Sequence, residues 1–298
     1  MGQAVMFSGQ GAQFVGMGQA LQGRSRKMWE CFERAGALLG YDISRICFQG
    51  PPELLAETII CQPALFTVGW GAFLTLQEGG FLDGLTVCCG QSLGEWVALV
   101  ATGIVTFEDG LHAVSQRARF MQDACEGEEG AMAAFIGGQR PRVLELCALA
   151  SVTISNFNAP DQVVISGKRE NVAEAITMAE KFGIRRAVAL NVAGAYHCSM
   201  MATAKERFAE VVESLPMKCP CVPFISNVTG KVVEDPEEIR RLIIEQIVSP
   251  VRWEDCMKTA WELGARTFYE CGAGKVLVGL CRKNLPDARA ISAEELPV

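Results

Sequence analysis

The chain has 298 residues, of which 50% are hydrophobic and 20% are charged. This composition is that of a folded globular protein and excludes a disordered or collagen-like chain. The 27 basic and 34 acidic residues give a formal net charge of −7, so overall charge does not favour binding to nucleic acid or to an anionic membrane.

We expect a cytoplasmic protein without a membrane span. The first residues, MGQAVMFSGQGAQ, lack the basic and apolar regions of a secretory signal. The longest apolar stretches, such as 97–107, are too short to cross a bilayer. The 13 cysteines form no paired CxxC array, so we expect reduced, buried thiols. Only His112 and His197 could supply imidazole, and no metal site is expected.

Short buried strands alternate with amphipathic helices along most of the chain. The patterns predict strands at 4–7, 85–89, 224–228 and 267–272, and helices at 28–39, 63–76, 93–101, 107–125, 202–215 and 252–263. This alternation predicts an α/β fold with a mostly parallel sheet covered on both faces.

The middle of the chain follows a different order. It predicts a strand at 130–138, a helix at 141–150, two strands within 152–167 around a turn at 158–161, a helix at 170–182 and a strand at 185–192. This β-α-β-β-α-β order is ferredoxin-like. We therefore expect a small subdomain at 128–192, inserted into a discontinuous catalytic core formed by 1–127 and 193–298.

The segment Gly90-Gln91-Ser92-Leu93-Gly94 fits the G-x-S-x-G pattern of a nucleophile elbow. It follows the strand at 85–89 and opens the helix at 93–101, which is the strand–turn–helix setting that the pattern requires. The free N–H groups of that helix would face an oxyanion formed at Ser92. The alternative is a glycine-rich turn with a helix-capping serine.

A serine hydroxyl needs a base to become a good nucleophile, and the chain has two histidines. His112 lies within the helix at 107–125, where a structural role is expected. His197 follows the last strand of the small subdomain, at the point where the chain returns to the core. Loops of this kind collect catalytic groups, so we assign His197 as the base.

Two weaker signals lie elsewhere. The glycines of FSGQGAQ (7–13) permit close backbone approach to a ligand, so an N–H here could complete an oxyanion hole with that of Leu93. An ordinary strand-to-helix turn is the alternative, and the spacing of a dinucleotide-binding loop is not met. Arg117 would select a substrate carboxylate if it faces the cleft, and would otherwise be a solvated surface residue.

Together these blocks resemble the malonyl-CoA:acyl carrier protein transacylases, the acyltransferase family of fatty-acid and polyketide synthesis. The likeness spans essentially the full length and includes FSGQGAQFVGMG, GQSLGEW, RARFMQ, GAMAAFIG, NFNAPDQVVISG, SPVRW and ECGAGKVLVGL. The resemblance implies an α/β-hydrolase-like core with an inserted ferredoxin-like subdomain.

The resemblance also implies a ping-pong reaction without a cofactor. Malonyl would pass from malonyl-CoA to a serine ester and then to the phosphopantetheine thiol of an acyl carrier protein. The residues it assigns are the nucleophile Ser92, the general base His197, the oxyanion-hole N–H groups of Gln10 and Leu93, the carboxylate-binding Arg117, and Gln246, whose backbone carbonyl would orient the histidine.

The family also implies a monomer and an acidic carrier protein as partner. Because this chain is acidic too, docking would need a local basic patch. The candidates are Lys168-Arg169, Lys181, Arg185-Arg186 and Arg282-Lys283.

Four positions depart from the usual family pattern. Gln91 stands where His usually precedes the serine, and Ser8 and Ala273 stand where Pro is usual. Tyr196 precedes the base at a position linked to extender-unit choice, which leaves the acyl specificity open. The alternatives are a transacylase for another unit such as methylmalonyl, a proofreading thioesterase, which should lack Arg117, and a catalytically dead carrier-docking module.

Overall fold

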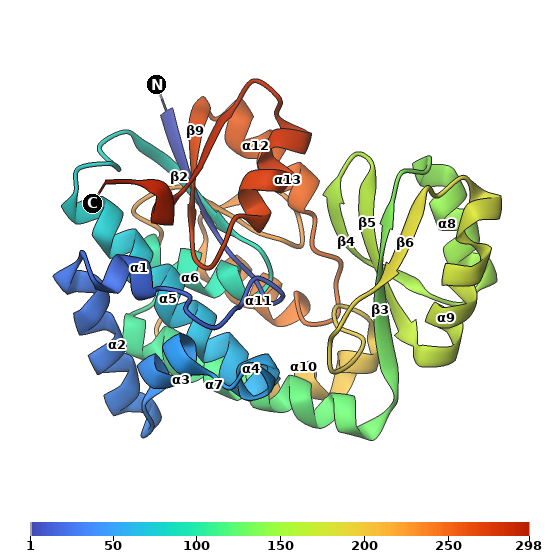
Figure 1. Ribbon diagram of the computed structural model, residues 1–298, viewed down its shortest axis with the longest axis horizontal. Helices are drawn as coiled ribbons and strands as arrows, with labels where there is room; N and C mark the ends of the chain where they lie inside the picture. Colours follow the sequence, from blue (N-terminus) through green and yellow to red (C-terminus); the bar gives the residue numbers. More distant parts are fainter. Residues whose placement is uncertain (1, 298) are drawn as a thin grey trace.

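The computed structural model describes residues 2–297 and places two sheets in separate lobes (Figure 1). The larger lobe holds a six-stranded sheet in the order β10-β9-β1-β2-β7-β8. Its strands are β1 (Gly2–Phe7), β2 (Leu85–Gly90), β7 (Phe224–Ile225), β8 (Val232–Val233), β9 (Ala265–Cys271) and β10 (Arg289–Ser292). Neighbouring strands are parallel except for β7 and β8. The predicted mostly parallel α/β sheet is confirmed.

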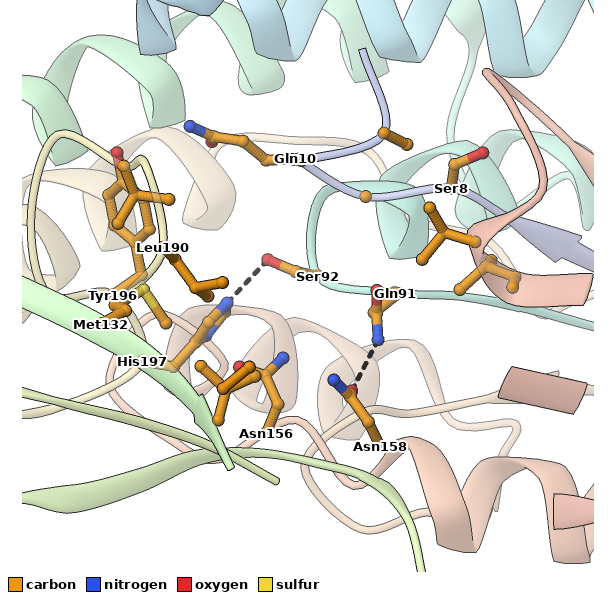
Figure 2. Close-up of a pocket in the computed structure, with 18 of the residues that line it drawn as sticks. Ser8, Gln10, Gln91, Ser92, Met132, Asn156, Asn158, Leu190, Tyr196 and His197 are labelled. Carbon is orange, nitrogen blue, oxygen red and sulfur yellow. Dashed lines mark hydrogen bonds between the residues drawn. The ribbon is translucent and has the colours of Figure 1, made fainter. Parts of the chain in front are cut away.

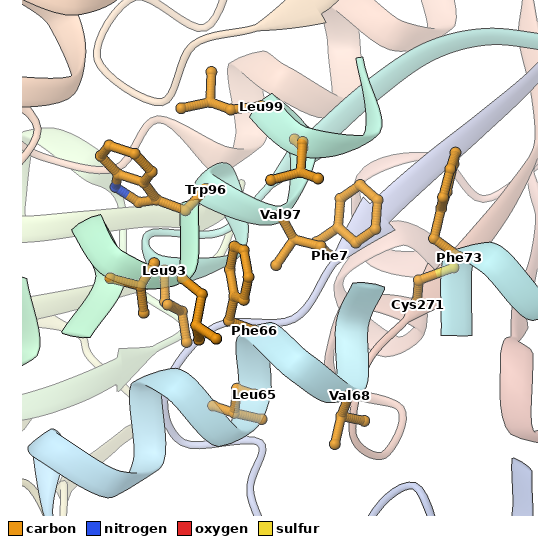
Figure 3. Packing of buried hydrophobic residues seen from close by; sticks show 14 of the residues in the cluster. Phe7, Leu65, Phe66, Val68, Phe73, Leu93, Trp96, Val97, Leu99 and Cys271 are labelled. Atoms are coloured by element: carbon orange, nitrogen blue, oxygen red, sulfur yellow. The ribbon is translucent and has the colours of Figure 1, made fainter. Parts of the chain in front are cut away.

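Helices cover both faces of this sheet, and β1 shows why its sequence is apolar throughout. Val5 and Phe7 pack with α5 (Thr58–Glu78) and α6 (Leu93–Ala101), as Figure 3 shows around Phe7. Ala4 and Met6 point the other way, against α12 (Trp253–Glu262) and α13 (Val276–Asn284). Successive side chains of a strand alternate between faces, so a strand buried on both faces needs a continuous apolar run.

The remaining helices of the larger lobe surround this core. They are α1 (Gln19–Gln22), α2 (Arg26–Leu39), α3 (Ile43–Gln49), α4 (Pro52–Ala56), α7 (Phe107–Gly127), α10 (Ala202–Glu213) and α11 (Pro236–Glu245). Helices α1, α3, α4, α11 and α13 and strands β8 and β10 were not predicted from the sequence, because most are too short to show a clear hydrophobic period.

Helix α5 is longer and more apolar than predicted. Its 21 residues are enough, by length and composition, to cross a membrane, so the expectation that every apolar stretch is too short was wrong for this segment. However, 78% of its most apolar window is buried inside the protein. That burial is typical of the central helix of a globular core.

The smaller lobe is a four-stranded antiparallel sheet with two helices. Its elements are β3 (Gly130–Ile136), α8 (Arg140–Leu149), β4 (Thr153–Ala159), β5 (Gln162–Lys168), α9 (Arg169–Met178) with a 3₁₀ turn (Ala179–Phe182), and β6 (Arg186–Ala189). The strand order β4-β5-β3-β6 matches the predicted ferredoxin-like arrangement.

Strand β4 also joins the two lobes. The N–H of Phe157 donates to the carbonyl of Val251 at 2.9 Å, and the N–H of Val251 donates to the carbonyl of Ser155 at 2.8 Å. These backbone bonds fix the small lobe against the segment that follows α11, so the cleft between the lobes has a defined width.

The prediction for the cysteines was right for most positions and wrong for a few. All 13 are free thiols, and ten of them are buried. Cys125 is half-buried, and Cys219 and Cys221 are exposed. The two exposed thiols lie between α10 and β7, in a segment without helix or strand, where no packing requirement buries them.

Candidate active site

Ser92 sits in the tight turn between β2 and α6, with φ 53° and ψ −105°. The turn leaves no room for larger neighbours. A Cβ on Gly90 would lie 2.0 Å from the backbone of Gly94, and one on Gly94 would lie 2.1 Å from the carbonyl oxygen of Phe7. The predicted strand–turn–helix setting is therefore present, and small residues are required on both sides of the strained serine.

His197 faces this serine from the loop that leaves the small lobe. Its Nε2 lies 2.7 Å from Ser92 Oγ (Figure 2). Its Nδ1 lies 2.8 Å from the carbonyl oxygen of Gln246. A carbonyl only accepts, so Nδ1 carries the proton and Nε2 is free to take one from the serine. Burial, reinforced by the charge of Arg117, lowers the pKa of His197 to about 4, so the ring is neutral at neutral pH.

Arg117 projects from α7 into the same cleft and is only 1% exposed. Its Nη2 donates to Ser92 Oγ at 3.1 Å and to Gln246 Oε1 at 3.0 Å, while Nη1 donates to Gln62 Oε1 at 2.7 Å. Burial lowers its pKa to about 10, which leaves it a cation at neutral pH. Within residues 2–297 its buried Nε–H has no acceptor, so the neighbouring residues do not satisfy every donor of the guanidinium.

Gln246 connects all three of these groups. It follows α11 and is fully buried. Its backbone carbonyl receives the His197 Nδ1–H, its Oε1 receives Arg117, and its Nε2 donates to the Ser92 carbonyl at 3.0 Å. The structure therefore brings Ser92, His197, Arg117 and Gln246 together, as the sequence-based assignment requires.

The loop after β1 forms the opposite side of the cleft. Gln10 lines the same pocket as Ser92, and its side chain contacts Gln62 and Thr58. The side chain of Leu93 is buried in the core (Figure 3), so only its backbone N–H, in the first turn of α6, is available to a ligand. Such N–H groups lack intrahelical acceptors, as an oxyanion-hole donor must.

Gln91 and Tyr196, which depart from the family pattern, both line this pocket. Gln91 Nε2 donates to Asn158 Oδ1 on β4 at 2.8 Å, a contact between the two lobes (Figure 2). The Tyr196 hydroxyl lies 2.8 Å from Thr58 Oγ1. Much of the remaining pocket lining is apolar and includes Met121, Met132, Ala134, Val164, Leu190 and Val192.

Sequence reasoning missed three polar residues beneath this site. Asn227 follows β7 and accepts the Ser92 N–H through Oδ1 at 2.7 Å. Glu95 lies in the first turn of α6 and is 1% exposed. Gln62 holds Arg117 from α5. Only Asn227 carried a usable signal, because it follows a strand at the sheet edge where ligands bind in α/β proteins.

The other predicted positions lie outside this site. His112 is on the exposed side of α7. Among residues 2–297 no group of three or more His, Cys, Asp or Glu side chains is arranged to hold a metal ion. Of the basic candidates, Lys168 and Arg169 pair with Glu128 and Glu129, whereas Arg185 and Lys283 both pair with Asp161 beside the pocket.

Comparisons with known proteins identify the family of the chain and its structural relatives. The sequence matches the family model of the acyl transferase domain over residues 5–296. The malonyl CoA-acyl carrier protein transacylase of Bacillus subtilis is 37% identical, over 94% of this chain and 89% of its own length. The acyl carrier protein S-malonyltransferase of Vibrio cholerae superposes with a TM-score of 0.92 at 34% identity, covering 98% of this chain and 96% of that one.

A second solved structure contains a partner. It is a malonyl transacylase in complex with its type II polyketide-synthase acyl carrier protein. This chain matches it with a TM-score of 0.96 at 32% identity, covering 99% of this chain and 97% of that one.

Proposed function

Because this chain belongs to the acyl transferase domain family, we propose that it transfers the malonyl group from malonyl-CoA to the phosphopantetheine thiol of an acyl carrier protein. The observation that carries the proposal is the position of Arg117. Its Nη2 lies 3.1 Å from the nucleophile Ser92, where a buried cation can bind the free carboxylate of a malonyl group whose thioester carbon is under attack.

In the first half-reaction Ser92 Oγ attacks the thioester carbon of malonyl-CoA. Its proton passes to His197 Nε2, and the Gln246 carbonyl stabilises the imidazolium that forms. The N–H groups of Gln10 and Leu93 receive the oxyanion, and each such donor is typically worth about 3–4 kcal/mol in the transition state. His197 then returns the proton to the departing CoA thiolate, and malonyl remains as an ester on Ser92.

In the second half-reaction the phosphopantetheine thiol of the carrier protein attacks this ester. His197 takes the thiol proton and returns it to Ser92 Oγ as the ester bond breaks, so the enzyme regains its starting state. The same base and the same oxyanion hole serve both halves. This symmetry suits a transfer between two thioesters of nearly equal energy.

Arg117 also bears on the alternatives. A proofreading thioesterase for uncharged acyl chains has no use for a buried cation beside the nucleophile, because a desolvated unpaired charge is costly. A dead docking module has no need of the Ser92–His197 contact at 2.7 Å. Malonyl and methylmalonyl both carry the carboxylate, so the choice between them rests on the pocket around Tyr196.

The partner and the setting follow from the same proposal. The relatives support an acyl carrier protein as acceptor, since one solved transacylase is bound to such a protein. We place the reaction in the cytoplasm, with the enzyme acting as a monomer, without a cofactor and away from membranes and nucleic acids.

Intact-protein mass spectrometry tests this function directly. Mixed with malonyl-CoA, the wild-type protein should gain one malonyl group, and it should lose that group when a phosphopantetheinylated carrier protein is added. Ser92→Ala should gain none. Acetyl-CoA and methylmalonyl-CoA, run in parallel, report the acyl specificity.

Arg117→Ala serves as the selectivity control. Losing a buried carboxylate partner should lower malonyl loading by at least about 100-fold, with a much smaller effect on acetyl loading. Turnover of acyl-carrier thioesters to free acid, without any malonyl adduct, would contradict the proposal and favour the hydrolase.

A further inference from the structure

Glu95 is a buried carboxyl group that the mechanism above does not use. It lies in the first turn of α6, three residues after Ser92, and is 1% exposed. Its Oε1 accepts the backbone N–H of Asn227 at 2.7 Å, and its Oε2 accepts Nε2–H of Gln246. Burial raises its pKa, while these two donors and the charge of Arg117 favour the ionised form, and the acceptance of an N–H by each oxygen is the pattern of a carboxylate. A buried carboxyl group is costly, so its place beneath the nucleophile calls for a role.

Gln246, the first of the two partners of Glu95, positions the base His197. The backbone carbonyl of Gln246 accepts the His197 Nδ1–H at 2.8 Å, and its side chain contacts Ser92 and Arg117. The amide of Gln246 has one acceptor end and one donor end. Glu95 accepts a hydrogen bond from the amide nitrogen, and Arg117 donates one to the amide oxygen. A flipped amide would place its oxygen against the carboxyl oxygen of Glu95 and its NH₂ against the donors of Arg117. Glu95 therefore fixes the orientation of Gln246.

Asn227, the second partner of Glu95, stabilises the turn that carries Ser92. The backbone of Asn227 is held by Glu95, and its side chain accepts the Ser92 N–H at 2.7 Å and donates to the carbonyl of Gly90 at 2.7 Å. Ser92 is in the left-handed region, with φ 53°, which costs free energy unless the surroundings enforce it. Asn227 is part of what enforces it.

We propose that Glu95 is a positioning residue whose carboxyl group, acting through Gln246 and Asn227, holds His197 and Ser92 in attack geometry. The inference rests on the Ser92–His197 chemistry of the proposed function, but not on malonyl as the acyl group. Glu95 touches neither Ser92 Oγ nor His197. The histidine Nδ1–H is bound by the Gln246 carbonyl rather than by a carboxylate, and Glu95 acts on it only indirectly, through Gln246.

A fluorophosphonate probe measures this role without any malonyl substrate. Ser92 Oγ attacks the phosphorus, its proton passes to His197 and fluoride leaves. Glu95→Gln keeps the shape of the side chain but replaces one acceptor oxygen with a donor. We expect its kinact to fall about 10- to 100-fold with KI unchanged, since breaking a buried hydrogen bond has an effect of this order. An unchanged kinact would overturn the proposal.

A matched control separates positioning from the general effect of altering a buried carboxyl group. Glu270 is also fully buried and accepts two backbone N–H groups, those of Leu277 and Val278. Glu270→Gln should lower thermal stability while leaving kinact within about twofold of wild type. If both variants slow labelling equally, Glu95 has no special role and the proposal is wrong.

A double-mutant cycle tests the route through Gln246. Gln246→Ala removes the amide but keeps the carbonyl that binds His197. In that background Glu95→Gln should slow labelling by less than about fivefold, because the group it orients is already gone. If the fold-reductions in labelling caused by the two substitutions simply multiplied in the double variant, Glu95 would not act through Gln246. Should Glu95→Gln fail to fold, Glu95→Asp, which is one methylene too short to hold both partners, should show the same fall in kinact, and wild-type labelling would refute the idea.

The probe also keeps the two proposals apart. Wild-type protein that reacts with the fluorophosphonate but accepts no malonyl would remove the proposed function and leave the Glu95 inference open to test. Normal malonyl transfer with unchanged labelling of Glu95→Gln would remove only the inference.

Discussion

Burial sets the working range of the residues around Ser92, and His197 shows this most clearly. Its pKa is lowered to about 4, first by burial and then by the charge of Arg117. The base must be unprotonated to act, so activity is lost only as the pH falls through this value. We therefore expect kcat/KM for malonyl transfer to stay level from about pH 8 down to about pH 5. A pH profile in buffers of constant ionic strength measures this.

The cause of the shift can be tested in the same way. Arg117→Ala removes a nearby positive charge, so the pKa of His197 should rise and the acid limb should move to higher pH. Fluorophosphonate labelling is the suitable readout for this variant, because the probe has no carboxylate to bind. An acid limb near pH 6.5 in the wild-type protein, the ordinary range of histidine, would contradict the argument.

The residues that could be assigned from sequence lie in a short recognisable motif or belong to a residue type that is rare in the chain. Ser92 lies in a short motif between a strand and a helix, and His197 is one of two histidines. Glu95 gave no such signal, because its role depends on a contact with Asn227, 132 positions further along the chain. Buried carboxyl and amide groups become recognisable only when the fold shows what they touch.

At the scale of elements, the joint between β2 and α6 depends on close backbone approach. A Cβ on Gly94 would lie 2.1 Å from the carbonyl oxygen of Phe7 and 2.9 Å from that of Ser8. Gly94→Ala must push α6 away from the loop that carries Gln10, so we expect it to lower the free energy of unfolding by about 1–3 kcal/mol and to slow Ser92 labelling. Urea denaturation and the fluorophosphonate probe measure the two effects.

Gly279 is the matched control for this substitution. It lies within α13, and a Cβ there would meet nothing within 4 Å. Gly279→Ala should therefore stabilise the protein by about 0.5–1 kcal/mol without altering labelling. If Gly94→Ala were as stable and reactive as Gly279→Ala, the turn would not need its glycine.

Helices and strands were predicted correctly where the hydrophobic pattern was clear. They were predicted poorly where contacts with other elements determine the ends of a segment. Helix α6 was predicted with its observed ends, Leu93 and Ala101. The strand expected at 224–228 has only two residues, Phe224 and Ile225, because the chain turns after them to place Asn227 under Ser92. Helix α5 begins at Thr58, before its predicted start at residue 63. Its first turns carry Thr58 and Gln62, polar residues that face the site and therefore interrupt the apolar pattern from which the helix was predicted.

At the scale of the whole molecule, the order of elements predicted both sheets, but no local pattern predicted how the lobes meet. The bonds between β4 and Val251 and the contact between Gln91 and Asn158 join segments far apart in the chain. They set the cleft that Arg117, His197 and the apolar wall of the small lobe share. Gln162 and Val276 line the pocket, and Val276 is 48% exposed, so we place its mouth beside them. The position of this mouth decides where a carrier protein can approach.

This placement separates the basic candidates for carrier docking. Lys283 donates to Gln162 at the mouth, at 2.9 Å, and both Lys283 and Arg185 pair with Asp161. Lys168 and Arg169 lie at the opposite end of β5, about 20 Å away at the rise of a strand. We expect charge reversal at Lys283 and Arg185 to raise the KM for holo carrier protein about 5- to 10-fold at low salt, since paired surface charges contribute about 1 kcal/mol.

Reversal at Lys168 and Arg169 makes the same change in net charge and should leave the KM measured at about 0.1 M ionic strength within about twofold, because charges beyond a Debye length of about 10 Å are screened there. Steady-state transfer to the carrier, repeated from low to high salt, distinguishes the pairs, since a docking contact weakens with salt. Loading of Ser92 from malonyl-CoA, measured separately, shows whether the mouth serves the carrier surface or only the pantetheine arm that both substrates share. Equal effects from the two reversals would mean that net charge, rather than a patch at the mouth, governs the encounter.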